Sequence, residues 1–168
     1  FHTAGQSIEI NEIGTFTDGY AVTKFKNIKA DGTAGSNLTW MDIDFPLFRL
    51  GEQYLIYAEA ALRGGSGGNL TTAVTYINRL RTRAVAASIV QAELTLPFIL
   101  DERGRELYWE GHRRTDLIRY GRLTTGTYLW PWKGGVMEGR TTESFRDIYP
   151  IPSSDLIANP TLVQNPGY

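Results

Sequence analysis

The feature that most constrains the fold of this chain is a pair of amphipathic segments separated by a glycine-rich stretch at residues 64–68. Apolar residues recur at helical spacing from Phe45 onward, and a second such series begins after Asn69. Pro46 suits the first turn of the first helix, and Asn69 has the side chain of a helix N-cap. The expected buried residues are Leu47, Leu50, Tyr54, Ala58 and Ala61 in the first helix and Leu70, Val74, Ile77, Leu80 and Ala84 in the second. The sequence therefore predicts an antiparallel helical hairpin, the unit of tetratricopeptide-like scaffolds.

The segments around this hairpin complete a mainly α chain. A third helix is expected over 96–110, with Thr95 as its cap, and a shorter one over 114–120. Brief apolar alternation within residues 1–44 predicts a few short strands and loops. Residues 123–168 are rich in Gly, Pro, Thr and aromatics, and predict a long ordered loop segment that wraps the helices. We expect three segments, 1–44, 45–122 and 123–168, to form one unit of a larger domain, because one hairpin cannot close its core alone.

Charged residues surround the predicted third helix and its C-terminal extension. They are Asp101, Glu102, Arg103, Arg105, Glu106, Glu110 and Arg113. Carboxylate pairs serve glycoside hydrolysis, but the many nearby arginines favour structural ion pairs that hold a covered helix in place. The spacing allows a pair between Asp101 and Arg105. It also allows one between Arg103 and Glu106.

Composition excludes several functional classes. The formal charge of −1 gives no electrostatic footprint for nucleic acid. The absence of cysteine removes thiol nucleophiles and Cys-ligated zinc, and with only two histidines we expect neither a metal site nor a cofactor. His112 has no Gly-x-Ser-x-Gly motif to serve, and a structural, hydrogen-bonded histidine is the expected alternative.

The aromatic segment at Trp130-Pro-Trp132, with Tyr128 beside it, is the candidate ligand-binding feature. Exposed indoles stack on sugar rings at little conformational cost, and Pro131 would stiffen the pair. The alternative is that both indoles fill the core beneath the loop. Trp109 is expected in the core, and Trp40 is a further candidate ligand contact whose environment the sequence leaves open.

Several stretches that follow one another along the chain point to a known family. In chain order they are Asp44–Arg49 with Tyr57–Ala60, the helix Ile77–Ala84, the stretch Ile99-Leu-Asp-Glu-Arg-Gly-Arg-Glu-Leu-Tyr-Trp-Glu-Gly-His-Arg113 followed by Asp116-Leu-Ile-Arg119, and the ending Tyr149-Pro-Ile-Pro152 with Asn159–Tyr168. Together they resemble the C-terminal part of the SusD/RagB family. The match departs at Arg114-Thr115, where that family usually has an aromatic pair.

The resemblance implies a tetratricopeptide-like helical scaffold with ligand-binding loops, of which this chain holds one part. It also implies an outer-membrane lipoprotein on the surface of Bacteroidetes-type bacteria, anchored through an N-terminal cysteine upstream of Phe1. Family members capture glycans, or in some cases peptides, and deliver them to a SusC-type TonB-dependent transporter without catalysis. The charged helix would then hold helices together rather than touch ligand.

The function expected from the sequence is therefore non-catalytic binding of oligosaccharides for uptake. Peptide uptake on the same scaffold and a tetratricopeptide-type protein-interaction module are the alternatives. A glycosidase is the remaining possibility, and it would need two carboxylates roughly 5–10 Å apart at an open cleft.

Overall fold

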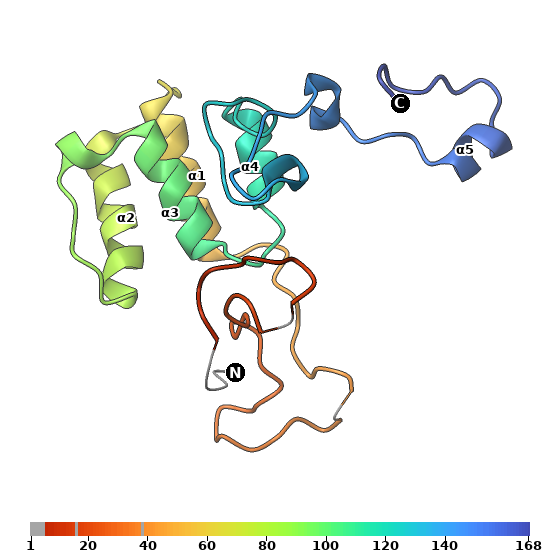
Figure 1. Cartoon of the computed structure of the whole chain (residues 1–168). Coiled ribbons are helices and arrows are strands. Elements are labelled where there is room, and N and C mark those ends of the chain that lie inside the picture. Colours follow the sequence, from red (N-terminus) through yellow and green to blue (C-terminus); the bar gives the residue numbers. More distant parts are fainter. Residues whose placement is uncertain (1–5, 16, 38) are drawn as a thin grey trace. The chain divides into compact units, whose positions relative to one another are not determined.

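Helices make up the regular secondary structure of this chain in a computed structural model that describes residues 6–15, 17–37 and 39–168 (Figure 1). The chain divides into two compact units, one ending at Arg49 and the other running from Leu50 to Tyr168. The second unit contains α1 (Leu50–Leu62), α2 (Leu70–Arg83), α3 (Leu96–Glu106), α4 (Arg113–Arg119) and α5 (Ser153–Ala158), with the 3₁₀ turns η1 (Gln91–Glu93), η2 (Lys133–Gly135) and η3 (Ser144–Asp147). The mainly α fold class expected from the sequence is confirmed. None of the helices in the described ranges has the length and apolarity that a membrane crossing requires.

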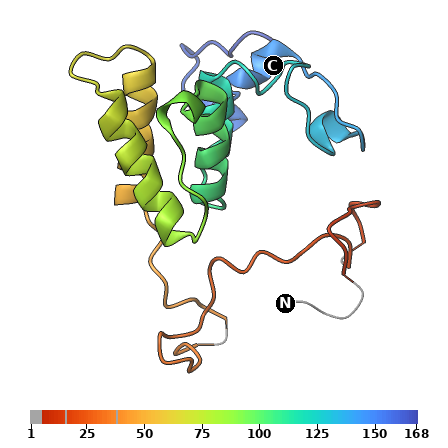
Figure 2. The same cartoon turned by 90° about the vertical axis from the view of Figure 1, so that its left-hand side faces the viewer.

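The α1–α2 hairpin forms as expected, with the two helices packed side by side (Figure 2). Asn69 is the N-cap of α2, because its Oδ1 accepts a hydrogen bond from Thr72 N at 2.9 Å. Gly64 has a φ of 80°, a left-handed conformation that residues with a Cβ rarely adopt. The tyrosine rings of α1 and α2 also meet, since Tyr54 stacks on Tyr76 with their centroids 4.6 Å apart. The turn between α1 and α2 is therefore determined by local signals, the Gly64 conformation and the Asn69 cap.

The first helix begins at Leu50, so its expected start near Phe45 is wrong. Pro46 consequently lies outside the helix. Leu47 and Phe48 continue the helical spacing but are 73% and 85% exposed, so they lack the packing that stabilises a helix in a folded protein. The buried face of α1 also differs from the expected stripe, because it is centred on Leu55 and Ala58 while Leu50 is exposed.

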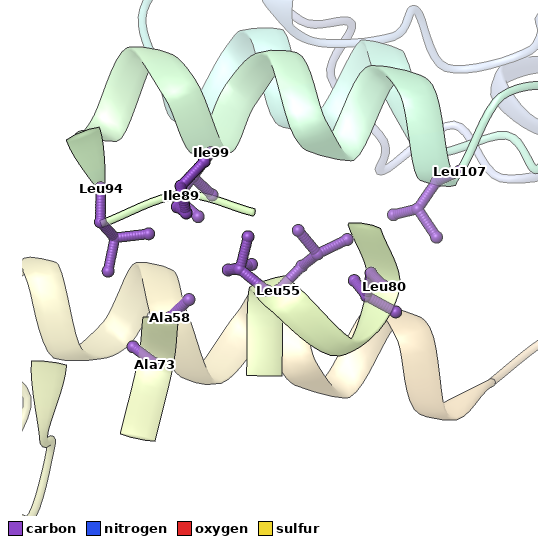
Figure 3. Packing of buried hydrophobic residues seen from close by; sticks show 9 residues of the cluster. Leu55, Ala58, Ala73, Leu80, Ile89, Leu94, Ile99 and Leu107 are labelled. Atoms are coloured by element: carbon purple, nitrogen blue, oxygen red, sulfur yellow. The ribbon is translucent and has the colours of Figure 1, made fainter. Parts of the chain in front are cut away.

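A hydrophobic core lies between α1, α2 and α3 (Figure 3). Its buried members are Leu55, Ala58, Ala73, Ile77, Leu80, Ile89, Leu94, Ile99 and Leu107. Leu55 and Ile99 are fully buried and come from α1 and α3, which pack against each other. The third helix therefore provides the surface that the hairpin alone lacks.

The third helix begins as expected and ends early. Thr95 Oγ1 accepts a hydrogen bond from Phe98 N at 3.3 Å, which caps the N-terminus. The helix ends at Glu106 rather than near Glu110, and the chain then turns. Trp109 has a φ of 60° and is 61% exposed, so its expected burial is wrong. The physical reason is the turn, which takes Trp109 out of the helical register.

Residues before Leu50 contain turns and two isolated bridges in place of the expected short strands, as far as residues 6–15, 17–37 and 39–49 are described. In this unit, side chains form hydrogen bonds with polar groups of the backbone. Asn27 Nδ2 donates to the carbonyl oxygen of Asn37 at 2.7 Å, and Asn27 Oδ1 accepts from Asp42 N at 3.1 Å. Apolar residues alternate over only a few positions between turns, and such short stretches provide too few backbone hydrogen bonds for a stable β-ladder.

Candidate functional site

A buried ion cluster joins α1, α3 and α4. Arg103 Nε on α3 lies 2.8 Å from Asp116 Oδ1 on α4, and the two side chains are 4% and 1% exposed. A second contact joins Arg103 Nη2 to Glu52 Oε1 on α1 at 3.9 Å. Arg119 lies 2.9 Å from Asp116 and 2.8 Å from Glu59 of α1. The cluster therefore fixes three helices relative to one another.

The other charged residues of α3 also form ion pairs that differ from the expected ones. Arg105 bonds to Glu102 rather than to Asp101, which is exposed. Glu102 additionally accepts from Arg81 of α2 at 3.1 Å, so this carboxylate links two helices. The expected pair of Asp101 with Arg105 is thus wrong, because Glu102 lies on the side of α3 that faces α2.

Two further acids belong to the same charged segment. Glu106 pairs with Arg83 of α2. Arg103 has its close ion pair with Asp116, in place of the contact with Glu106 that spacing favoured. Glu110 is only 4% exposed although it follows the end of α3. Glu106 is thus bound by an arginine, and Glu110 is buried.

Arg113 connects the charged helix to the loop that carries Tyr128, Trp130 and Trp132, which we call the aromatic loop. Its Nη1 donates to the carbonyl oxygen of Leu100 at 2.8 Å, and its Nη2 donates to the hydroxyl of Tyr128. A Cβ added at Gly104 would lie 3.1 Å from Arg113 Nη1. The glycine in the middle of α3 therefore makes room for this guanidinium group.

A pocket of about 360 Å³ lies where α4 meets the aromatic loop, and we call it the Tyr128–Trp130 pocket. Its lining consists of Arg113, Arg114, Leu117, Leu123, Tyr128 and Trp130. The centroids of the two aromatic rings are 6.1 Å apart, and both side chains are half-buried. Two aromatic faces beside guanidinium groups provide the stacking and hydrogen-bonding groups that sugar rings use.

The remaining predicted ligand contacts lie elsewhere. Trp132 is half-buried with a φ of 68°, and it is not among the residues that line this pocket. Trp40 belongs to the other unit and is 74% exposed. The structure thus brings together Tyr128 and Trp130 from the predicted set.

The structure reveals two features that sequence reasoning missed. Lys133, directly after the aromatic motif, is 3% exposed, and no local pattern distinguishes it from a solvated lysine. A second pocket of about 630 Å³ lies at the α3–α4 corner, where Tyr108 and Trp109 contribute exposed rings. The consecutive aromatics Tyr108-Trp109 were the available signal, but the place of Trp109 inside the expected third helix, among charged residues, predicted that it lies in the core.

Two arginines hold Glu59 of α1 in its ionised form. Burial alone would raise the pKa of Glu59, but hydrogen bonds from Arg119 and Arg63 overcome this and lower its pKa to about 2. An acid of that strength is ionised and bound to arginine at neutral pH, whereas a general acid must hold a proton.

His112 Nδ1 lies 3.6 Å from Glu52 Oε1, which gives it a structural partner. Within the described ranges no three potential metal-ligating side chains of His, Cys, Asp or Glu gather in one place.

The Glu59 contact predicts a pH dependence of stability. Because the pKa of Glu59 is lowered in the folded state, the contact stabilises the fold fully above about pH 4.5 and loses its effect as the pH falls toward about 2. Glu59→Gln should therefore flatten the fall in unfolding free energy across this range. Urea titrations at several pH values measure it, with Glu143→Gln as the exposed control. Equal slopes for wild type and Glu59→Gln would contradict the assignment.

The geometry defines a helical scaffold fixed by buried ion pairs that carries an aromatic pocket beside α4. The sequence profile of the SusD family matches residues 4–168. The chain is 45% identical to the starch-binding protein SusD of Bacteroides thetaiotaomicron, over 97% of this chain and 28% of that protein. SusD-like protein P2 of Formosa agariphila is 31% identical, over 82% of this chain and 28% of that protein.

Solved structures agree with the sequence comparisons. A SusD superfamily protein from Bacteroides vulgatus superposes with a TM-score of 0.61 at 31% identity, over 82% of this chain and 31% of that chain. The surface glycan-binding protein A from Bacteroides uniformis has a TM-score of 0.61 at 28% identity, over 83% of this chain and 30% of that chain. This chain belongs to the SusD family, which confirms the resemblance found in the sequence. It spans 28% of the length of the two curated relatives.

Proposed function

We propose that this chain is part of a non-catalytic glycan-binding protein and that the Tyr128–Trp130 pocket contacts the sugar. The observation that carries the proposal is the pairing of two half-buried aromatic rings with two arginines around a space of about 360 Å³. Such a space accepts a sugar ring by stacking, while guanidinium groups donate hydrogen bonds to hydroxyls. The name of the starch-binding relative supports an α-glucan as the first ligand to test.

The absence of catalysis is part of the same proposal. Glu102 and Glu106 of α3 are bound to arginines of α2, and the acids of the ion cluster are bound to Arg103 and Arg119. A glycosidase needs one protonated carboxyl group and one free carboxylate facing the bond to be cleaved. The paired acids of this scaffold match a structural role better.

The cellular role rests on the family. We propose that the protein is a lipid-anchored component of the bacterial outer-membrane surface that delivers its glycan to a SusC-like TonB-dependent transporter. Membership of the SusD family supports this assignment. Copurification of a TonB-dependent transporter with the tagged protein from its native membrane tests it, and recovery of the tagged protein from the periplasm alone would contradict it.

Trp130→Ala tests the binding site. The stacking face is lost, so the affinity for a malto-oligosaccharide should fall about tenfold or more. Isothermal titration calorimetry measures this, with circular dichroism to confirm the fold. Trp109→Ala is the matched control, because it removes an equally large exposed indole that does not line this pocket. Equal affinity of Trp130→Ala and wild type would contradict the proposed site, and competition by oligopeptides rather than sugars would contradict the proposed ligand.

A further inference from the structure

A buried ammonium group lies directly beneath the aromatic loop. Lys133 is 3% exposed, and its Nζ donates to the carbonyl oxygens of Thr125 at 2.6 Å and Tyr128 at 2.8 Å. The carbonyl oxygen of Arg122 lies 3.4 Å away. Its hydrogen-bond acceptors in the described part of the chain are thus main-chain carbonyls. Burial lowers the pKa of Lys133, while the charge of Asp147 acts in the opposite direction.

The same ammonium group contacts the aromatic loop in a second way. Lys133 Nζ lies 4.7 Å from the centroid of the Trp130 ring, within the range of a cation–π contact. The backbone of the lysine also bonds to this loop, because Lys133 N donates to the carbonyl oxygen of Trp130 at 3.1 Å. One side chain therefore touches both members of the pocket's aromatic pair, through the Tyr128 carbonyl and the Trp130 ring.

Burying a charge is unfavourable unless hydrogen bonds replace its water shell. Here the carbonyl oxygens supply that replacement, and in return the ammonium group satisfies carbonyls from three separate loop positions. Removal of the charge would leave those carbonyls without this donor, a penalty that is relieved only if water reaches them. The three hydrogen bonds thus tie these loop positions to one cation.

We propose that Lys133 is the positioning residue of the Tyr128–Trp130 pocket: its ammonium group gathers the loop carbonyls and holds the Trp130 ring at the angle that receives the ligand. The cage of carbonyls is then itself a binding site for a small alkylammonium ion once the lysine side chain is removed. The ligand part of this inference rests on the proposed function. The positioning part rests on the contacts of Lys133 alone.

The three carbonyl oxygens around Lys133 Nζ determine which substitutions test the proposal. Lys133→Ala leaves a cavity between the carbonyl oxygens that methylammonium fills, because it carries three N–H donors on a compact charge. Lys133→Met keeps the length of the side chain without its charge, so the space stays occupied and the carbonyls lose their donor. Lys29→Ala is the control, because it removes an exposed lysine in the other unit.

The test uses protein labelled with 5-fluorotryptophan, in which ¹⁹F NMR reports each of the four indoles separately. Lys133→Ala should shift or broaden the Trp130 resonance and reduce malto-oligosaccharide affinity about tenfold. Methylammonium should restore both in Lys133→Ala. It should restore neither in Lys133→Met, and tetramethylammonium, which has no N–H donor, should restore neither in either variant.

Two results would overturn the inference. One is an unchanged Trp130 resonance in Lys133→Met, the variant that best preserves packing. The other is a folded Lys133→Ala whose Trp130 resonance is altered but does not respond to methylammonium. If the wild type binds no malto-oligosaccharide, the proposed ligand fails while the Trp130 resonance and its recovery with methylammonium still decide the role of Lys133.

Discussion

Asp116→Ala should lower the free energy of unfolding by about 3–5 kcal/mol, because it leaves the buried guanidinium group of Arg103 without its close partner. Arg103 is 3% exposed, and its remaining carboxylate contact, with Glu52, is 3.9 Å long. The charge is then left buried without a close counter-ion. Urea unfolding followed by circular dichroism measures the effect.

Two further variants separate burial from charge pairing as such. Glu143→Ala breaks the exposed pair of Arg146 with Glu143, whose side chains are 53% and 63% exposed, and should leave the urea midpoint essentially unchanged. The double variant Arg103→Met with Asp116→Leu removes both buried charges and should recover most of the stability lost in Asp116→Ala. If Asp116→Ala behaves like Glu143→Ala, the cluster is solvated and does not join the helices.

Leu55→Ala should cost about 2–5 kcal/mol of unfolding free energy, since it opens a cavity where α1 meets α2 and α3. Leu55 is fully buried, whereas its neighbour Ile56 is 45% exposed. Ile56→Ala, the matched control on the same helix, should cost about 1 kcal/mol or less. Thermal and urea unfolding measure both. Comparable losses would mean that the buried face of α1 is assigned to the wrong residues.

Features encoded by short-range chemistry were predictable from the sequence. Asn69 and Thr95 cap their helices as expected, because a capping side chain acts within three residues of itself. The left-handed turn at Gly64 likewise needs only a residue without a Cβ. These signals are local, and they suffice to place the hairpin and the start of α3.

The partners of the charged residues were not predictable in the same way. Helical spacing offers Arg103 a neighbour on its own helix, but its close partner is Asp116 of α4. Glu59 and Arg119 are 60 residues apart in the sequence and bond at 2.8 and 2.9 Å. Which of several acids an arginine meets depends on how the helices pack, and a linear pattern does not contain that information.

The candidate site shows the same limit. Proximity in the sequence correctly placed Tyr128 beside Trp130, but it could not distinguish Trp130 from Trp132, which is not among the residues that line the pocket. Arg113 reaches this site from the end of the charged segment through its bond to Tyr128. Lys133 Nζ meets three carbonyl oxygens beneath the loop, and this meeting depends on the folded path of residues 122–133.

A ¹⁹F NMR titration of 5-fluorotryptophan-labelled protein with a malto-oligosaccharide tests most directly whether the ligand binds at the Tyr128–Trp130 pocket. Binding there predicts a saturable shift of the Trp130 resonance, whereas the resonances of Trp40 and Trp109 stay in place. A saturable shift of Trp109, with Trp130 unmoved, would place recognition at the α3–α4 corner beside the ion cluster. That result would contradict the division of this chain into a charged scaffold and a separate aromatic binding loop.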